Sequence, residues 1–170
     1  NNKMPVAETT LAQLLKANGY ATFFAGKWHL GDTPETYPQN RGFDVNIGGW
    51  SRGGPYTGNK YFAPFKNPEI KIESPEGEHL PARLARETSR FIADNQDRPF
   101  LAYLSFYSVH TPLMGRPDLV RKYNKKAAAI NGEEFASEEQ VIGNKPRKVR
   151  ILQKHAVYAA MVEAMDEAVG

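Results

Sequence analysis

Two apolar segments separated by a long crossover constrain the fold of this chain more than any other feature. Residues 20–25 are aromatic and bounded by glycines, and residues 100–106 are almost continuously apolar. Both patterns predict buried strands, and the second is typical of a strand in a sheet covered on both faces. Between them, residues 80–95 place apolar side chains on one helical face. A strand, a crossover with a helix and a second strand favour parallel pairing in one α/β sheet.

The carboxyl ends of these two strands are the expected place for a ligand. His29 follows the first strand and His110 follows the second. Because parallel strands end at the same edge of a sheet, the topology predicts both imidazoles at one rim. Imidazole titrates near neutral pH, so such a pair can donate, accept or shuttle a proton. The alternative is that each histidine only satisfies local hydrogen bonds, and the sequence pattern leaves it open.

The stretch from Gly26 to Gly31 adds a cation to this rim. If it is extended, Lys27 and His29 share one face while Trp28 and Leu30 take the other. The flanking glycines let a ligand approach the main chain closely. The stretch therefore suits a tetrahedral oxyanion, with Lys27 as a point charge.

The rest of the chain predicts helices and irregular segments. Thr10 and Gln13 fit a capping box for a helix over residues 11–18. Residues 32–79 are irregular, and within them residues 48–56 either line a substrate mouth or fold over their own aromatic rings. Further helices are expected from Pro117 to about Tyr123 and over residues 149–169, with an exposed or partly disordered polar insertion over residues 124–150. His79 and His155 lie in no motif and are expected to be structural.

Composition excludes several functions. The chain has no cysteine, so it has no disulfide, thiolate metal site or cysteine nucleophile. A net charge of +3 is mild for a nucleic-acid binder, and no nucleic-acid or nucleotide-binding motif is present. No apolar run approaches the ~20 residues of a membrane span, and no signal peptide is visible. We expect neither nucleic acid nor membrane as a partner.

The chain carries four motifs, Thr10–Tyr20 with Gly26–Gly31, Arg41–Asp44, Tyr107–Pro112 and Tyr158–Asp166. In their order and spacing, these motifs resemble those of the arylsulfatase-type sulfatases, which depend on formylglycine. The resemblance covers most of the chain, and it implies an α/β, alkaline-phosphatase-like fold with a mostly parallel sheet. Residues 1–170 would be part of the catalytic domain, an internal fragment of a longer protein.

The resemblance also implies roles for three residues. Lys27 would hold the sulfate and the formylglycine side chain, His29 would act on the formylglycine hydroxyl, and His110 would contact the sulfate ester near the leaving oxygen. The nucleophile and the calcium carboxylates would lie outside this chain, which has no C/S-x-P/A-x-R motif. The expected partners are a sulfated small molecule or sulfated glycan and the rest of the parent chain, in a periplasmic, extracellular or lysosomal compartment.

Two alternatives to a sulfate-ester hydrolase stay open from the sequence. One is a phosphodiesterase or phosphonate hydrolase of the same superfamily. The other is a non-catalytic anion- or glycan-binding module that keeps the rim without the nucleophile. In each case the isolated fragment is expected to lack turnover.

Overall fold

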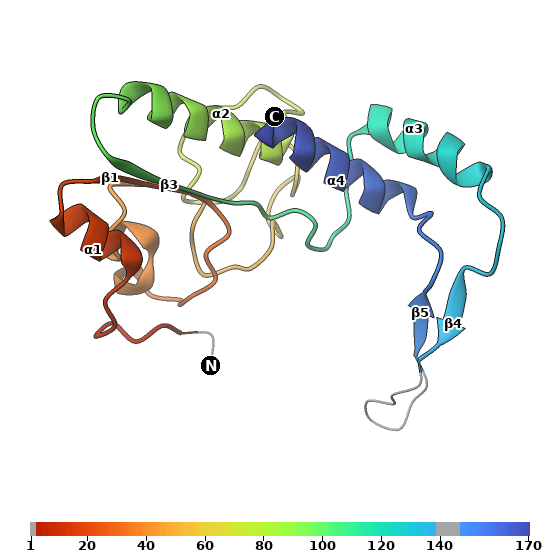
Figure 1. Cartoon of the computed structure of the whole chain (residues 1–170), viewed down its shortest axis with the longest axis horizontal. Helices are drawn as coiled ribbons and strands as arrows, with labels where there is room; N and C mark the ends of the chain where they lie inside the picture. Colours follow the sequence, from red (N-terminus) through yellow and green to blue (C-terminus); the bar gives the residue numbers. More distant parts are fainter. Residues whose placement is uncertain (1–2, 139–146) are drawn as a thin grey trace. The chain divides into compact units, whose positions relative to one another are not determined.

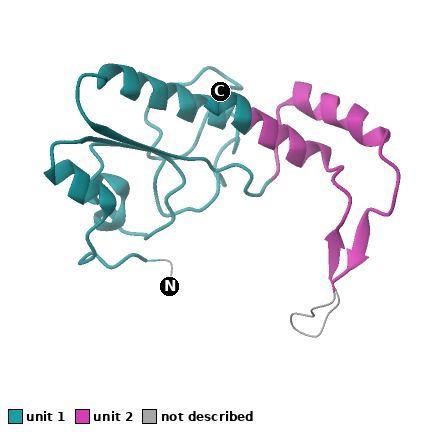
Figure 2. Cartoon of the chain, in the orientation of Figure 1, with its two compact units in different colours: residues 1–112, 165–170 teal, residues 113–164 magenta. Residues whose placement is uncertain are grey.

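The computed structural model describes residues 3–138 and 147–170, which form two compact units (Figures 1 and 2). Unit 1 runs to residue 112 and also includes residues 165–170, whereas unit 2 comprises residues 113–164. Both histidines of the predicted rim belong to unit 1.

A three-stranded parallel sheet organises unit 1. β1 (Ala21–Gly26) lies in the middle, with β2 (Val45–Ile47) on one side and β3 (Phe100–Ser105) on the other. In register, Ala21 pairs with Phe100 and Gly26 with Ser105, so the predicted parallel pairing is confirmed. Every residue of β1 is buried, as its apolar sequence predicts. β2 lies inside the segment expected to be irregular and was not predicted.

Helices lie on opposite sides of this sheet (Figure 1). Alternate residues of β1 point to opposite faces, so Phe23 stacks on Phe91 of α2 (Leu80–Asp94) with ring centroids 4.8 Å apart. On the other face, Phe24 packs with Ala12 of α1 (Leu11–Ala17) and with Phe43. The core of unit 1 is thus built from both faces of β1.

β3 is less covered than its sequence suggests. Its residues are half-buried or exposed, and the Tyr103 side chain is 50% exposed although its ring stacks on Phe24. Within the described residues, β1 is the strand that pairs with β3. The sequence predicted that other elements would cover both faces of β3, and the described residues of this chain do not cover them fully.

The segment around Arg41 to Asp44 fastens α1 to the sheet. The Arg41 guanidinium donates to the carbonyl oxygens of Val6, at 2.8 Å, and Glu8. The Asp44 carboxylate accepts from the Thr22 backbone N–H and hydroxyl, both at 2.9 Å, and pairs with Lys16 at 2.6 Å. Burial raises the pKa of Asp44, but the hydrogen bonds from Lys16 and Thr22 outweigh it and hold the pKa below its ordinary value. This motif has a structural role.

Two short 3₁₀ turns, η1 (Pro34–Thr36) and η2 (Pro38–Asn40), lie within the long irregular segment. The predicted capping box is present, because Thr10 and Gln13 each bond the other's backbone N–H.

Across residues 3–138 and 147–170, no helix is both long and apolar enough to span a lipid bilayer.

Unit 2 differs from expectation at two helix boundaries. α3 (Pro117–Ala128) continues beyond Tyr123, and α4 (Ala156–Val169) begins well after Val149. Val149 instead lies in β5 (Lys148–Arg150), which pairs antiparallel with β4 (Phe135–Ser137). A strand pairing thus replaces the first turns of the predicted helix. Part of the predicted polar insertion, residues 139–146, lies outside the described residues.

Candidate active site

The site begins where β1 and β3 end side by side. The Lys27 backbone N–H donates to the Ser105 carbonyl at 2.7 Å. Gly26 has a φ of 110°, and a Cβ there would lie 1.7 Å from the same carbonyl oxygen. Only glycine fits this close approach. Lys27 is therefore the first side chain beyond the joined strand ends.

The chain turns after Lys27 instead of staying extended. His29 has a φ of 61°, and its backbone N–H donates to the Trp50 carbonyl at 3.1 Å. The segment is not extended as predicted, because β1 ends at Gly26 and His29 is left-handed, so strand alternation does not apply to Lys27 and His29. Lys27 and His29 are both half-buried.

Trp28 holds this turn from the side of the core. Its indole N–H donates to the Thr36 carbonyl at 2.7 Å, and its ring packs edge to face on Phe24 and Phe43. The turn is thereby fixed to the hydrophobic core.

His110 comes from a turn fixed by two buried tyrosines. The Tyr61 hydroxyl lies 2.9 Å from the Tyr107 carbonyl and 2.8 Å from the His110 carbonyl. The Tyr107 hydroxyl donates to the Gly48 carbonyl at 2.7 Å. Burial raises the pKa of both hydroxyls, which keeps them protonated and able to donate. The turn after β3 is thus fixed to the loop that begins at Gly48.

One loop contacts both predicted imidazoles. Gly53 packs so tightly on His29 that a Cβ at Gly53 would lie 2.3 Å from His29 Nδ1. Three residues later, the Tyr56 hydroxyl lies 3.2 Å from His110 Nδ1. One loop thus contacts both histidines, His29 through Gly53 and His110 through Tyr56, while the shared rim and the chemical roles of the two histidines stay predictions. Both readings of residues 48–56 stay open, because the loop contacts the two histidines and also packs the Tyr56 ring on its own Gly54.

Sequence reasoning did not single out Gly53 or Tyr56 as individual site residues. The available signal was the Gly53–Gly54 pair followed by an aromatic residue, in a stretch with no acidic residue from position 45 to 68. That stretch carries Arg52, Lys60 and Lys66. Contact with the histidines depends on tertiary packing, which the sequence pattern does not encode.

Lys27 supplies the charge of the site. Among the described residues, no carboxylate forms an ion pair with its ammonium group, in contrast to Lys16, which pairs with Asp44. An ammonium group without a protein counter-ion is available to an anionic ligand. That Lys27, His29 and His110 together receive an oxyanion stays a prediction.

The described residues do not fit a calcium site. Within residues 3–138 and 147–170, no three His, Cys, Asp or Glu side chains lie close enough together to hold a metal ion. Carboxylate oxygens are the usual protein ligands of calcium. We therefore assign no residue of this chain to calcium and derive no chemical step through it.

The two histidines outside the motifs occupy structural positions. His79 is buried beside the rings of Tyr61 and Phe62, immediately before α2. His155 Nδ1 accepts the Tyr158 backbone N–H at 3.2 Å at the start of α4. Both positions agree with the structural role expected for them.

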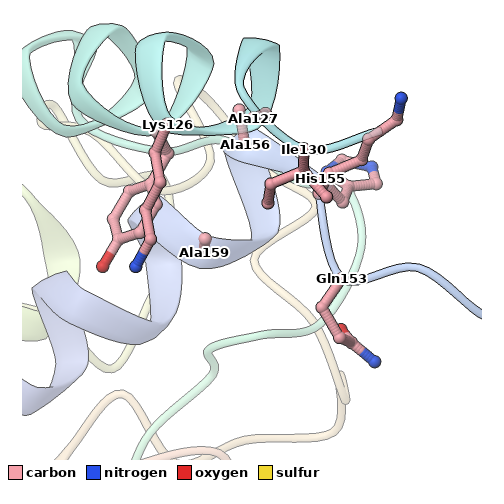
Figure 3. A pocket seen from close by; sticks show the side chains of 9 residues that line it. Lys126, Ala127, Ile130, Gln153, His155, Ala156 and Ala159 are labelled. Atoms are coloured by element: carbon pink, nitrogen blue, oxygen red, sulfur yellow. The ribbon is translucent and has the colours of Figure 1, made fainter. Parts of the chain in front are cut away.

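Unit 2 contains a hollow of about 80 Å³ between α3 and the start of α4 (Figure 3). Lys126 and His155 line it over a floor of Ala127, Ala156 and Ala159. None of the three sequence-predicted site residues is part of its lining.

Comparison with known proteins supports one family. The sulfatase family model matches residues 2–170. The chain is 27% identical to an arylsulfatase of Klebsiella aerogenes over 68% of this chain and 27% of that protein. It is 32% identical to human arylsulfatase A over 64% of this chain and 26% of that protein.

A solved structure gives the same result for the fold. The crystal structure of Ps i-CgsB in complex with k-i-k-neocarrahexaose covers 99% of this chain with a TM-score of 0.68 and 26% identity. This chain covers 36% of that protein, and it spans about a quarter of the two arylsulfatases. With the family model matching almost every residue, this chain belongs to the sulfatase family.

Proposed function

We propose that this chain is part of a sulfatase that hydrolyses sulfate esters and that it supplies the Lys27, His29 and His110 side of the active site. The observation that carries the proposal is that one loop contacts both histidines, which follow the paired strands β1 and β3. Gly53 of this loop packs on His29, and Tyr56 contacts His110. Membership of the sulfatase family supports the reaction type.

Lys27 would neutralise the sulfate group. A sulfate monoester carries one negative charge spread over three oxygens, and a fixed ammonium stabilises that charge best where water is partly excluded. Lys27 is half-buried and fixed at its backbone by Ser105. The backbone that carries this charge is thus fixed before the substrate arrives.

The two imidazoles would handle protons and orient the ester. His29 is held by its backbone bond to Trp50 and by Gly53, whereas His110 is held by Tyr61 and Tyr56. An imidazole within hydrogen-bond reach of a leaving oxygen can protonate it as the S–O bond breaks. We assign that task to His110 and the opposite side of the sulfate to His29.

The nucleophile is proposed to lie outside residues 1–170. The sequence has no cysteine and no C/S-x-P/A-x-R motif, so it holds no site for conversion to formylglycine. The relatives are about four times longer than the matched region, which leaves room for the nucleophile elsewhere in the whole protein.

The proposed substrate class is a sulfated glycan. Ps i-CgsB was crystallised with the oligosaccharide k-i-k-neocarrahexaose. In this chain, the acid-free stretch from residue 45 to 68 carries three cations and the exposed ring of Tyr56. An exposed ring beside cations suits a sugar ring that carries anionic groups.

The test is hydrolysis of a chromogenic aryl sulfate and of a sulfated oligosaccharide by the full-length protein. We expect sulfate release, and we expect Lys27→Ala and His110→Ala each to lower kcat/KM by about 100-fold or more. Lys71→Ala is the matched control, since the Lys71 side chain is 77% exposed.

Three outcomes would count against the proposal. Hydrolysis of phosphate diesters without sulfate release would favour the phosphodiesterase alternative. Binding of the sulfated glycan without release of sulfate would favour a non-catalytic module. A near-normal rate in either variant would remove that residue from the machinery.

A further inference from the structure

The turn that carries His110 is closed by its own backbone and by one distant side chain. The His110 backbone N–H donates to the Tyr107 carbonyl at 2.9 Å, so residues 107–110 form a hydrogen-bonded turn. The Tyr61 hydroxyl donates to the carbonyls at both ends of this turn, to Tyr107 at 2.9 Å and to His110 at 2.8 Å. One hydroxyl, 49 positions before His110, thus spans the whole turn.

Tyr61 is itself fixed to the beginning of α2. Its backbone carbonyl accepts the N–H of Leu80, the first residue of α2, at 2.8 Å. The Tyr61 ring lies beside the ring of His79, with centroids 6.2 Å apart. Tyr61 and Leu80 are both buried, with 0% and 2% of their surface exposed. The hydroxyl therefore reaches the turn from a support inside the core of unit 1.

The link between Tyr61 and the turn depends on a single oxygen atom. A carbonyl oxygen can only accept, so the hydroxyl donates in both contacts and shares its one hydrogen between them. Because Tyr61 is fully buried, bulk water does not compete for these bonds. Tyr61→Phe keeps the ring but removes both bonds, while the Tyr107 carbonyl keeps the His110 N–H. The substitution should therefore loosen the turn without abolishing it.

We propose that Tyr61 is a positioning residue that sets where the His110 imidazole meets the leaving oxygen of the ester. This inference rests on the proposed sulfatase function. Tyr61 acts through His110, because its own side chain is fully buried and out of reach of a substrate. Protonation of a leaving oxygen needs the donor within hydrogen-bond reach, and a displacement of about 1 Å can lower a rate by about 100-fold.

The test is Tyr61→Phe in the full-length protein, alone and combined with His110→Ala. Alone, we expect kcat for an aryl sulfate to fall about tenfold with KM within about twofold, because the leaving oxygen is protonated in the transition state. In the His110→Ala background, Tyr61→Phe should change kcat by less than about twofold, since the residue that it positions is gone. A purely structural role would lower kcat by the same factor in both backgrounds.

A second readout compares two aryl sulfates whose phenols differ in acidity. The leaving group of 4-nitrophenyl sulfate needs little protonation, whereas that of phenyl sulfate depends on it strongly. Tyr61→Phe should therefore lower kcat for phenyl sulfate about fivefold more than kcat for 4-nitrophenyl sulfate. Both rates are measured in one preparation, so their ratio does not depend on how much of the variant is folded.

Thr88→Val is the matched control. Thr88 is also buried, and its hydroxyl donates to the Leu84 carbonyl at 2.8 Å within α2. The substitution removes a buried hydroxyl donor of unit 1 without touching the turn that carries His110. It should leave KM, kcat and the ratio of the two substrates unchanged.

Histidine-selective NMR at one fixed pH gives a readout that needs no turnover. The His110 ring lies edge to face with the Tyr56 ring, with centroids 5.5 Å apart, so the ring current of Tyr56 makes the His110 signal sensitive to its position. The His110 signal is assigned as the one that disappears in His110→Ala. We expect it to move in Tyr61→Phe and to stay in place in Thr88→Val.

The two readouts separate this inference from the proposed function. An unmoved His110 signal in Tyr61→Phe, or an equal loss of kcat with and without His110, would overturn the role of Tyr61 even in an active sulfatase. Absence of sulfate release by the unaltered protein would overturn the function, while a moved signal would still establish that Tyr61 positions His110.

Discussion

Lys27 donates its backbone N–H to the Ser105 carbonyl at 2.7 Å, which joins the ends of β1 and β3 at the point where the site begins. Lys27 and His29 follow β1, and His110 follows β3. The geometry of the site therefore depends on this junction remaining closed.

The first prediction concerns the glycine at this junction. Gly26→Ala places a Cβ 1.7 Å from the Ser105 oxygen at a φ of 110°, so the strands must separate. We expect a loss of unfolding free energy of about 3 kcal/mol or more, from backbone strain and overpacking together. Urea denaturation measures it.

Gly77→Ala provides the matched control. Gly77 also has a positive φ, 75°, but nothing lies within 4 Å of its added Cβ. Gly77→Ala should lower the unfolding free energy only through backbone strain, by about 1 kcal/mol. Equal losses in the two variants would show that the close approach to Ser105 is unimportant.

The second prediction concerns the indole that holds the turn. Trp28→Phe removes the donor to the Thr36 carbonyl, bonded at 2.7 Å, and leaves a buried acceptor unsatisfied. We expect a stability loss of about 1–3 kcal/mol and weaker turnover, measured by denaturation and sulfate release. Leu30→Ala, at a 40% exposed position in the same turn, should cost much less. A larger loss in Leu30→Ala would contradict the anchoring role of Trp28.

The third prediction concerns pH. The folded-state pKa of Asp44 is lowered below 3.8, since the bonds from Lys16 and Thr22 outweigh the effect of burial. Its contribution to stability is therefore complete above the unfolded value and is lost as the pH falls through the folded value. Asp44→Asn should lower the unfolding free energy near neutral pH. It should also make the unfolding free energy fall less steeply as the pH drops below about 4.

Urea midpoints measured from neutral to acidic pH test this prediction. Asp97→Asn is the control, because it makes the same change at an exposed residue before β3. An unchanged acid decline in Asp44→Asn would show that another group controls it.

The sequence was informative where burial controls structure. The apolar runs before His29 and His110 predicted β1, β3 and their parallel pairing, because hydrophobic periodicity is a direct consequence of which faces are buried. The same topology placed the two histidines at neighbouring strand ends. The three-residue β2 is too short to produce a readable pattern.

Features set by tertiary contacts could not be read from the sequence. The left-handed turn at His29 depends on the Trp50 carbonyl, and the Tyr56–His110 contact joins residues 54 positions apart. The helix expected from residue 149 begins only at Ala156, and Val149 instead pairs with Ala136 in a short antiparallel ladder. In each case a distant partner decides the conformation.

The most direct measurement is a titration of the full-length protein with inorganic sulfate, followed by histidine-selective NMR. Lys27, His29 and His110 should bind the anion together, so the signals of both His29 and His110 should move with one dissociation constant, and Lys27→Ala should abolish the shifts. His79 and His155, at their structural positions, should not respond. Different dissociation constants for His29 and His110, or an equal response from His155, would contradict a shared oxyanion site.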